Sequence, residues 1–327
     1  MSPTNADTRE QAFIEARNVP RLTDTEIAER IQCVFSAAYW QKLCPFLSVG
    51  RDKPLPAPEK HSLSEEEQKR LVDRFVRDGY LKSGPVIEES ILTDLKSAFV
   101  TLRKHELPPV FAYVYDQFWD VARAPSVRAL MSHALGAGCR QSPRIWAFHL
   151  GIENGVAGWP PHVDGGHLAH TTDRVTLWLP ITDATLENGC MNVVPKHLLP
   201  ASLPDDFAND SSRVSPKIWR IMLQGARPLP AQAGSILAWD FQVVHWSSFC
   251  DGAAEPRMSL AVEIMGPNVE PTDGELPLFD LESLPPFHER LRAIAKGLLS
   301  YQRFEPTTLR YMGLGRKMLD KLDLEQT

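Results

Sequence analysis

The sequence predicts a mainly β fold, a barrel or sandwich with flanking helices, and three observations lead to this class. Between residues 143 and 266, seven short runs rich in β-branched and aromatic side chains are separated by Gly, Pro and Asn. The segments 1–142 and 267–327 carry helical patterns instead. Proline makes up 27 of 327 residues, about 8% against about 5% in average proteins, which favours turns over a helical bundle. We therefore expect one structural unit, in which a mostly helical region at 1–142 packs on the β core and a helical extension follows it.

Composition and charge exclude several classes of protein. Hydrophobic residues make up 43% and charged residues 23%, which excludes a long disordered chain. The net charge is −6 and no basic block occurs, so neither nucleic acid nor an anionic membrane is an expected partner. The first twenty residues lack the apolar stretch of a signal peptide, and no apolar run reaches the length of a membrane span. Five scattered cysteines without a Cys-x-x-Cys pair indicate reduced thiols, and we expect a cytoplasmic globular protein.

Helical segments flank the predicted core on both sides. Two capping boxes open the first two helices: Thr23 with Glu26, and Ser64 with Glu67. A proline-rich connector at 44–62 separates them, and a weaker helical pattern covers 90–105. After the core, a helix is expected over 286–300, and its apolar face makes it a possible homo-oligomer interface.

The predicted strands are interrupted by one long segment. The apolar runs are RIWAFHLGI, PPHVDGG, DRVTLWLPI, GCMNVVP, GSILAWDF, QVVHWSSF and RMSLAVEI. The segment from 200 to 217 has no periodicity and many turn-forming residues, which predicts a loop. We expect this loop either to close over the mouth of the barrel as a lid, with Phe207 facing the pocket, or to be an ordinary surface excursion.

A metal-ligand pattern occurs in the second of these runs. On a strand, His162 and Asp164 point to the same face and can both reach one ion. His245 is the leading candidate for a third ligand from another strand. Two imidazoles and one carboxylate form the facial triad of non-haem Fe(II) oxygenases, which leaves three coordination positions open. So short a motif also arises by chance, and a hydrogen-bonded structural histidine is the alternative interpretation.

A possible anion site accompanies the triad. Arg257 lies twelve residues after His245 and begins the run RMSLAVEI. A buried guanidinium at this position would bind one end of a dicarboxylate through two hydrogen bonds. The alternative is an exposed charge at the start of a strand.

Four stretches of the chain follow a recognisable order: HVDGG, DRVTLWLPITDATLENGCMNVVP, AGSILAWDFQVVHWSS and PRMSLAVE. In this order the chain resembles the phytanoyl-CoA dioxygenase-like proteins, which are Fe(II)/2-oxoglutarate-dependent oxygenases. The resemblance covers residues 143–265, with a looser match of the helical segments before them, and its most specific part is the phrase DATLENGC. It implies that the core is a double-stranded β-helix, a cupin-like jelly roll.

The resemblance also implies an iron site. Carried over residue by residue, His162, Asp164 and His245 would bind Fe(2+), with 2-oxoglutarate as cosubstrate and O2 as oxidant, and 143–266 would be the catalytic core. One branch of the family has Gly or Ala in place of the aspartate and halogenates its substrates. Asp164 therefore favours hydroxylation, or a related oxidation such as desaturation or ring formation.

Further residues are assigned to the cosubstrate by the same resemblance. Arg257 would bind the distal carboxylate of 2-oxoglutarate, Ser247 would assist, and Trp178 would line the site. Arg144 is the next candidate if Arg257 has another role. Family members commonly continue from V-P with Gly-Ser-His, whereas this chain has Pro-Lys-His, so His197 is given no role.

The expected function is oxidation of a small organic substrate, with succinate and CO2 as co-products. A secondary metabolite, an acyl-thioester and an amino acid all remain open as substrates. Five residues are candidates for substrate contact: Trp146, His149, Trp159, His167 and Phe207. For each, an ordinary core or surface role is the alternative.

A different class of function fits the same ligands. A non-oxidative cupin-like protein would use them to bind Zn or Ni for hydrolysis or isomerisation, or would only sense a small ligand. Arg257 and Ser247 discriminate between the classes, since a hydrolase has no need to bind a dicarboxylate. An inactive relative that serves as a binding module is disfavoured by the intact triad.

Overall fold

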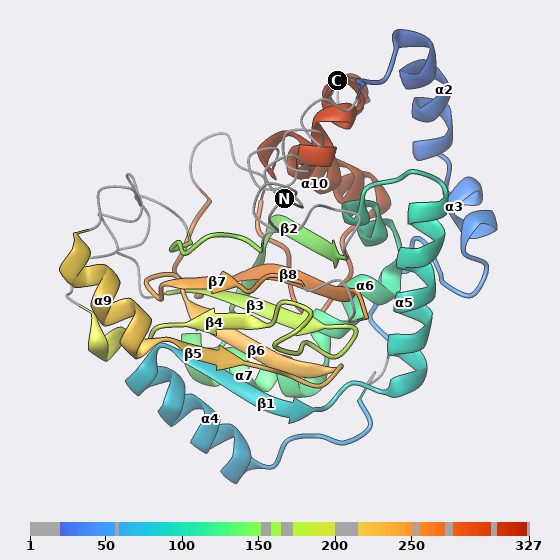
Figure 1. Ribbon diagram of the computed structural model, residues 1–327. Coiled ribbons are helices and arrows are strands. Elements are labelled where there is room, and N and C mark those ends of the chain that lie inside the picture. The colour runs from blue at the N-terminus through green and yellow to red at the C-terminus, as the bar shows by residue number, and fades with distance from the viewer. Residues whose placement is uncertain are drawn as a thin grey trace, which may run out of the picture.

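The computed structural model describes residues 20–55, 59–151, 158–164, 173–199, 215–250, 255–271, 277–301 and 306–325. Two antiparallel sheets lie at the centre of the molecule and helices surround them (Figure 1). This arrangement confirms the predicted mainly β class with flanking helices.

The strands are β1 (Tyr80–Pro85), β2 (Arg140–Leu150), β3 (Arg174–Pro180), β4 (Met191–Val193), β5 (Arg227–Leu229), β6 (Ser235–Asp240), β7 (His245–Ser247) and β8 (Arg257–Met265). The α-helices are α2 (Asp24–Val34), α3 (Ala37–Leu43), α4 (Glu65–Asp78), α5 (Glu89–Lys104), α6 (Asp116–Asp120), α7 (Pro125–Leu135), α9 (Pro216–Gly225), α10 (Phe287–Ser300) and α11 (Met312–Leu324). Short 3-10 helices are η1 (Pro109–Val114), η2 (Val121–Arg123), η5 (Lys196–Leu198) and η8 (Pro306–Tyr311). One sheet has the strand order β1-β6-β3-β8-β2 and the other the order β5-β4-β7.

The two faces of the five-stranded sheet have different roles. Leu177 of β3 and Val262 of β8 belong to the main hydrophobic core, which the sheet shares with the helices. Trp178 belongs instead to a second core that includes Val193 of the smaller sheet. Because successive side chains on a strand alternate between faces, every second residue of β3 and β8 faces the space between the sheets. That space contains the candidate site.

The predicted helices that precede the core are confirmed. Both capping boxes form, with the Thr23 hydroxyl accepting from the Glu26 N–H and the Ser64 hydroxyl from the Glu67 N–H. Gly79 ends α4 with a φ of +81°, and a Cβ there would lie only 2.5 Å from a Val243 side-chain carbon. Only glycine satisfies both the left-handed backbone and the close approach.

Two expectations about secondary structure were wrong. The N-terminal half contains β1, which pairs with β6 at the edge of the large sheet, because long-range pairing outweighs the weak local pattern of YLKSGP. The segment predicted as a loop to 217 ends earlier, since Ser215 caps α9 and Pro216 occupies its first turn. The remainder of that loop, 200–214, lies outside the described residues, so the lid and the role of Phe207 stay predictions. The short strand β5 was not expected, whereas the helix α11 lies in the helical extension predicted at 267–327.

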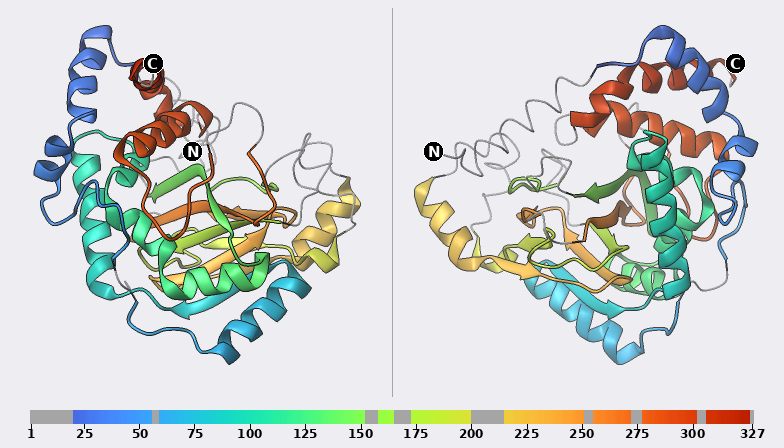
Figure 2. Two further views of the ribbon diagram at one scale, coloured as in Figure 1. Left: turned by 180° about the vertical axis from the view of Figure 1, so that it is seen from behind. Right: turned by 45° about the vertical axis from the view of Figure 1, so that its right-hand side comes forward.

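The C-terminal helices pack within the chain. Helix α10 contacts η1, β2 and α11, and Leu291, Ile294 and Leu298 are buried there. The face expected to form an oligomer interface is therefore covered in the single chain. Helix α11 also packs against α2, which places the two ends of the described chain together (Figure 2). Among the described helices, none has the length and apolar character needed to cross a membrane.

A buried ion-pair network joins the connector after α3 to two helices. Arg290 of α10 and Asp116 of α6 are fully buried, and Arg290 Nη1 lies 2.5 Å from Asp116 Oδ1. Arg51 Nε lies 3.2 Å from Asp116 Oδ2, and Arg51 Nη2 lies 2.5 Å from Asp120. The Gly50 N–H donates to Asp116 at 3.0 Å. Asp116 thus holds segments that are far apart in the sequence.

Replacing Asp116 with alanine is expected to lower the free energy of unfolding by about 3–5 kcal/mol, because it leaves the buried Arg290 charge uncompensated. Urea denaturation followed by circular dichroism measures the change. Asp73→Ala, which removes an exposed pair with Lys69, serves as the control and should leave the midpoint nearly unchanged. Equal midpoints for the two variants would show that the buried network does not stabilise the fold.

Candidate metal centre

His162 and His245 meet across a single β-bridge. The His162 N–H donates to the His245 carbonyl at 3.0 Å, and the His245 N–H donates back at 2.9 Å. Asp164 follows in a turn, so the segment HVD is not the strand that the sequence predicted. Proline and glycine on either side limit the pairing to one residue. The two side chains nevertheless lie together, because the bridge holds His162 and the turn directs Asp164 to the same side.

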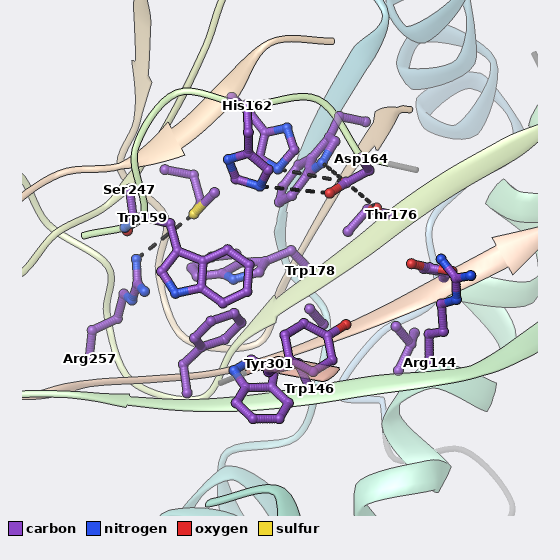
Figure 3. A pocket seen from close by; sticks show the side chains of 17 residues that line it. Arg144, Trp146, Trp159, His162, Asp164, Thr176, Trp178, Ser247, Arg257 and Tyr301 are labelled. Atoms are coloured by element: carbon purple, nitrogen blue, oxygen red, sulfur yellow. Dashed lines mark hydrogen bonds and ion pairs between the residues drawn. The ribbon is translucent and has the colours of Figure 1, made fainter. Parts of the chain in front are cut away.

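The three predicted ligands converge. His162 Nε2 lies 3.7 Å from Asp164 Oδ1, and His245 Nε2 lies 3.6 Å from Asp164 Oδ2. One nitrogen or oxygen from each residue falls within 4.8 Å of the others. Figure 3 shows the imidazoles and the carboxylate pointing at a common place in the cavity. A single metal ion can therefore contact all three.

Backbone carbonyls orient both imidazoles. His162 Nδ1 lies 2.8 Å from the Pro160 carbonyl oxygen, and His245 Nδ1 lies 3.0 Å from that of Val243. A carbonyl only accepts, so each Nδ1 carries the proton and each Nε2 presents a lone pair toward Asp164. Burial lowers the pKa of His162 to about 4, which keeps the ring neutral at neutral pH, the form that coordinates a metal.

Two side chains hold the carboxylate. The Thr176 hydroxyl donates to Asp164 Oδ2 at 2.6 Å, and Trp239 Nε1 donates to the same oxygen at 3.0 Å. Burial raises the pKa of Asp164, but the neighbouring imidazoles and these two donors outweigh it and the pKa falls below its ordinary value. The donor set is two imidazoles and one carboxylate, which suits a divalent transition metal. From the sequence, Thr176 and Trp239 were expected only to lie on strands, and their contacts with Asp164 were not predicted.

A cavity surrounds the triad. It brings together eight of the residues selected from the sequence: His162, Asp164, His245, Arg257, Ser247, Trp178, Trp146 and Trp159. His149 does not line it, because it alternates with Trp146 and Phe148 on β2, where it pairs with the core residue Met258, and its contact with substrate stays a prediction. His167 lies outside the described residues. His197 contacts Asp78 instead, with 3.3 Å between Nδ1 and Oδ1.

Arg257 occupies the end of the cavity where Ser247 and Trp178 lie, and it is almost fully buried. Its guanidinium donates to the Gly189 carbonyl and lies over the Trp178 ring at 5.4 Å and the Phe148 ring at 5.9 Å. Its Nε has no hydrogen-bond partner, and within the described part of the chain no carboxylate pairs with it. Burial lowers the pKa of Arg257 to about 10, so it remains charged at neutral pH. The alternative of an exposed strand-start charge is wrong.

Ser247 lies beside this guanidinium pocket on β7. Its hydroxyl accepts a hydrogen bond from the Trp159 N–H at 2.9 Å, which fixes both residues against each other. Figure 3 shows Ser247 and Trp159 on the Arg257 side of the cavity, with Trp178 behind them. The three residues expected to contact the cosubstrate thus share one end of the cavity.

A second, larger cavity adjoins the first. Six residues line both: Arg144, Trp159, His162, Asp164, Glu263 and Tyr301. The triad therefore lies where the cavities meet. Tyr301, at the end of α10, stacks on Trp146 with 4.0 Å between ring centroids, and this aromatic wall continues to Trp159 at 5.9 Å. The sequence carried no signal for Tyr301 or Glu263, because their position depends on how α10 and β8 pack.

Glu263 should make stability depend on pH. Burial raises its pKa to about 7, so the folded protein retains a proton that the unfolded chain, with a carboxyl pKa near 4.5, releases. Between these values the folded state binds more protons than the unfolded state, so the free energy of unfolding falls as pH rises. Glu263→Gln should flatten this part of the profile in urea denaturation at pH 4.5–7.5. A profile that keeps the wild-type slope would show that another group is responsible.

Comparison with known proteins agrees with the fold and the site. Residues 96–257 match the family model described as phytanoyl-CoA dioxygenase (PhyH). The solved structure of the non-heme alpha ketoglutarate dependent epimerase SnoN from nogalamycin biosynthesis is 21% identical over 68% of this chain and 94% of that chain, with a TM-score of 0.52. The carbocyclase SnoK from the same biosynthesis is 19% identical over 68% of this chain and 99% of that chain, with a TM-score of 0.51. The non-heme monooxygenase ThoJ is 13% identical over 77% of this chain and 99% of that chain, with a TM-score of 0.52.

These structures share the fold at low identity, and no curated protein sequence matches the chain. The family match includes all three metal-ligand candidates and ends at Arg257. The architecture is accordingly the cupin-like jelly roll that the sequence resemblance implied, with helices before and after it. Residues 96–257 of the chain, which contain the candidate metal ligands, are thus phytanoyl-CoA dioxygenase-like.

Proposed function

We propose that the protein is an Fe(II)- and 2-oxoglutarate-dependent dioxygenase that hydroxylates a small organic substrate of secondary metabolism, with residues 143–266 as its catalytic core. One observation carries the proposal. A His-Asp-His cluster, in which His245 is buried and the other two residues are partly buried, lines the same cavity as a buried arginine without a described carboxylate partner. A metal and a dicarboxylate together complete this arrangement.

His162, Asp164 and His245 would hold the iron. When bound there, Fe(II) supplies the activation of O2, with electrons from the conversion of 2-oxoglutarate to succinate and CO2. The protein residues fix the ligand geometry: the Pro160 and Val243 carbonyls set the imidazole planes, while Thr176 and Trp239 hold the carboxylate. A metal held by these three ligands would leave coordination positions for cosubstrate and oxygen.

Arg257 would bind the distal carboxylate of 2-oxoglutarate. Its charge is desolvated and held by two aromatic rings and the Gly189 carbonyl, so an incoming carboxylate meets an oriented cation in a water-poor environment. Ser247 and Trp178 lie beside it and would shape the same end of the cavity. The organic substrate would then enter from the larger cavity, along the wall formed by Trp146, Trp159 and Tyr301.

Arg257 also separates this proposal from the non-oxidative alternatives. A Zn or Ni hydrolase, an isomerase or a sensor on the same ligands would leave the buried guanidinium without a counter-ion. Hydroxylation is a more specific proposal than oxidation in general. The similar structures are described as an epimerase, a carbocyclase and a monooxygenase, which supports oxidation of a small molecule and leaves hydroxylation as the proposal from Asp164.

Thr176→Val is expected to weaken Fe(II) affinity by about 10–100-fold, because the ligating carboxylate loses its closest donor. Thr176→Ser keeps the hydroxyl and is the matched control, with affinity close to wild type. Anaerobic titration with Fe(II) measures both. Equal affinities for valine and serine variants would show that Thr176 does not orient the ligand.

The function itself is tested by screening a small-molecule library with Fe(II), 2-oxoglutarate and air while following succinate. We expect at least one compound to raise succinate formation and to gain an oxygen atom by mass spectrometry. Catalysis of hydrolysis or isomerisation with Zn alone, and no succinate with any compound, would favour the non-oxidative alternative.

A further inference from the structure

Arg174 lies at the opposite end of the site from Arg257. Arg174 begins β3 and pairs with Met265 at the end of β8, whereas Arg257 begins β8. Eight steps of extended strand, about 27 Å, separate the backbone positions of Arg257 and Met265. Thr176, which donates to Asp164, follows Arg174 by two residues on the same face of β3. The metal centre therefore lies between two arginines.

Arg174 carries a buried charge that is not paired. It is only 6% exposed, and its Nε is enclosed by protein without a hydrogen-bond partner. Within the described ranges, no carboxylate oxygen lies within 4.0 Å of its guanidinium. Because arginine stays protonated in proteins, the side chain is a desolvated cation.

Glu263 lies on β8 across from Thr176, and it does not neutralise Arg174. Burial raises the pKa of Glu263 to about 7, so this carboxyl retains a proton in part of the molecules at neutral pH. It interacts with Arg144, takes a hydrogen bond from Ser142, and interacts only weakly with Arg174. The main partners of Glu263 are thus other residues, and Arg174 is left without a paired anion.

Buried arginines with a structural role in this protein have full sets of partners. The Arg123 guanidinium donates to backbone carbonyls and to the Gln141 side chain, and Arg290 pairs with Asp116. An unpaired buried charge is costly, so a structural arginine closes on such partners. Arg174 instead lines the larger cavity, as the proposed cosubstrate arginine lines the smaller one.

The wall of the larger cavity favours an anion. Arg144, Arg174 and Lys296 all line it. Apart from the metal-ligand aspartate and the partly protonated glutamate described above, its acidic lining residue is Glu270, which pairs with Arg140 at 3.1 Å. A negatively charged ligand is therefore attracted to this cavity, and a cationic one is not.

An apolar surface connects Arg174 with the metal centre. Trp159 and Tyr301 line both cavities, with 5.9 Å between their ring centroids. Along β3, Arg174 and Thr176 are about 7 Å apart, and Thr176 contacts a metal-ligand candidate. A ligand whose charged end lies on Arg174 would thus place a carbon a few bonds away beside the triad.

We propose that Arg174 binds a carboxylate of the organic substrate, which is accordingly an apolar acid oxidised a few bonds from that carboxylate. This inference rests on the proposed function and names its substrate class. The planar guanidinium offers two parallel donors to a carboxylate. The apolar part of the substrate would lie along Trp159 and Tyr301. A neutral metabolite would leave the buried charge of Arg174 uncompensated.

The test uses benzoic, phenylacetic, cinnamic, indoleacetic and decanoic acids as probes, each with its primary amide, and phenyl phosphate as a different anion. Isothermal titration calorimetry measures binding to the full-length protein with saturating 2-oxoglutarate, both with Fe(II) under anaerobic conditions and without iron. Succinate formation in air then measures turnover. We expect at least one acid to bind and to stimulate succinate formation, and its amide to bind at least tenfold more weakly.

Two variants assign the preference for the acid to Arg174. Arg174→Gln should weaken binding of the acid at least tenfold, to the level of the amide, and leave the 2-oxoglutarate KM unchanged. Arg174→Lys keeps a charge without the planar fork, so it should keep part of the preference for the acid, and it tests the site even where the glutamine variant does not fold. The control is Arg128→Gln, which alters an ion pair with Glu282 outside both cavities and should behave as wild type. Circular dichroism verifies the fold of each variant.

The outcomes separate this inference from the proposed function. The carboxylate site would be overturned by equal binding of acid and amide, by an unchanged preference in Arg174→Gln, or by phenyl phosphate binding better than every carboxylate. Binding of no acid once 2-oxoglutarate is saturating would overturn it as well. Failure of Fe(II) and 2-oxoglutarate to bind the wild type would overturn the proposed function, whereas acid binding that depends on Arg174 without iron would still stand.

Discussion

Asp164→Ala is expected to abolish turnover while the fold remains intact. The substitution removes the one carboxylate ligand of the proposed iron site and leaves the two imidazoles. Changes in residues that only support a ligand cost about 10–100-fold, so loss of the ligand itself should lower succinate formation by more than about a hundredfold. Activity with Fe(II), metal content and circular dichroism are measured on the same preparation.

The control for this variant is Asp320→Ala, which removes an exposed carboxylate on α11 and should have wild-type activity. Chelation of the metal should abolish the activity of the wild type and the control alike. An Asp164→Ala protein that still hydroxylates its substrate, or a wild type that is fully active with Zn alone, would contradict the oxygenase account.

Arg257→Ala should raise the KM for 2-oxoglutarate at least tenfold and change the affinity for the organic substrate little. Truncating one partner of a buried charge pair costs about 2–5 kcal/mol, largely because the other charge is left desolvated and unpaired. Steady-state kinetics with varied 2-oxoglutarate measures the effect. Arg257→Lys should recover only part of the loss, since lysine cannot form two parallel hydrogen bonds.

The matched control is Arg227→Ala, because Arg227 also begins a strand but is exposed and donates only to nearby backbone carbonyls. Its KM for 2-oxoglutarate should equal that of the wild type. An unchanged KM for Arg257→Ala would mean that another cation binds the cosubstrate, with Arg144 at the opposite side of the cavity as the next candidate.

The metal ligands could be predicted from the sequence even though the reason given was partly wrong. His162 and Asp164 were expected on a strand, whereas one β-bridge and a turn hold them. The spacing still places both side chains on one side, because residues i and i+2 also share a side in a short extended segment. Arg257 could be predicted as a candidate on different grounds. A charged residue at the start of an apolar strand is either exposed to solvent or buried in a site.

The surroundings of the site could not be predicted, because they depend on register and packing. Thr176 and Trp239 contact Asp164 through the pairing of β3 with β6, and threonine and tryptophan in a strand otherwise look like ordinary β-formers. Tyr301 reaches the cavity from the end of a helix more than a hundred residues after Asp164. The edge strand β1 was missed because its partner, β6, is more than 150 residues away.

The most direct test of the account is the anaerobic addition of 2-oxoglutarate to the Fe(II)-loaded protein, followed by visible absorption. The account predicts a weak charge-transfer band that saturates with 2-oxoglutarate in the wild type, needs higher concentrations in Arg257→Ala, and is missing in Asp164→Ala. Absence of the band in wild-type protein that holds one Fe(II) per chain, or an identical band in all three proteins, would contradict it.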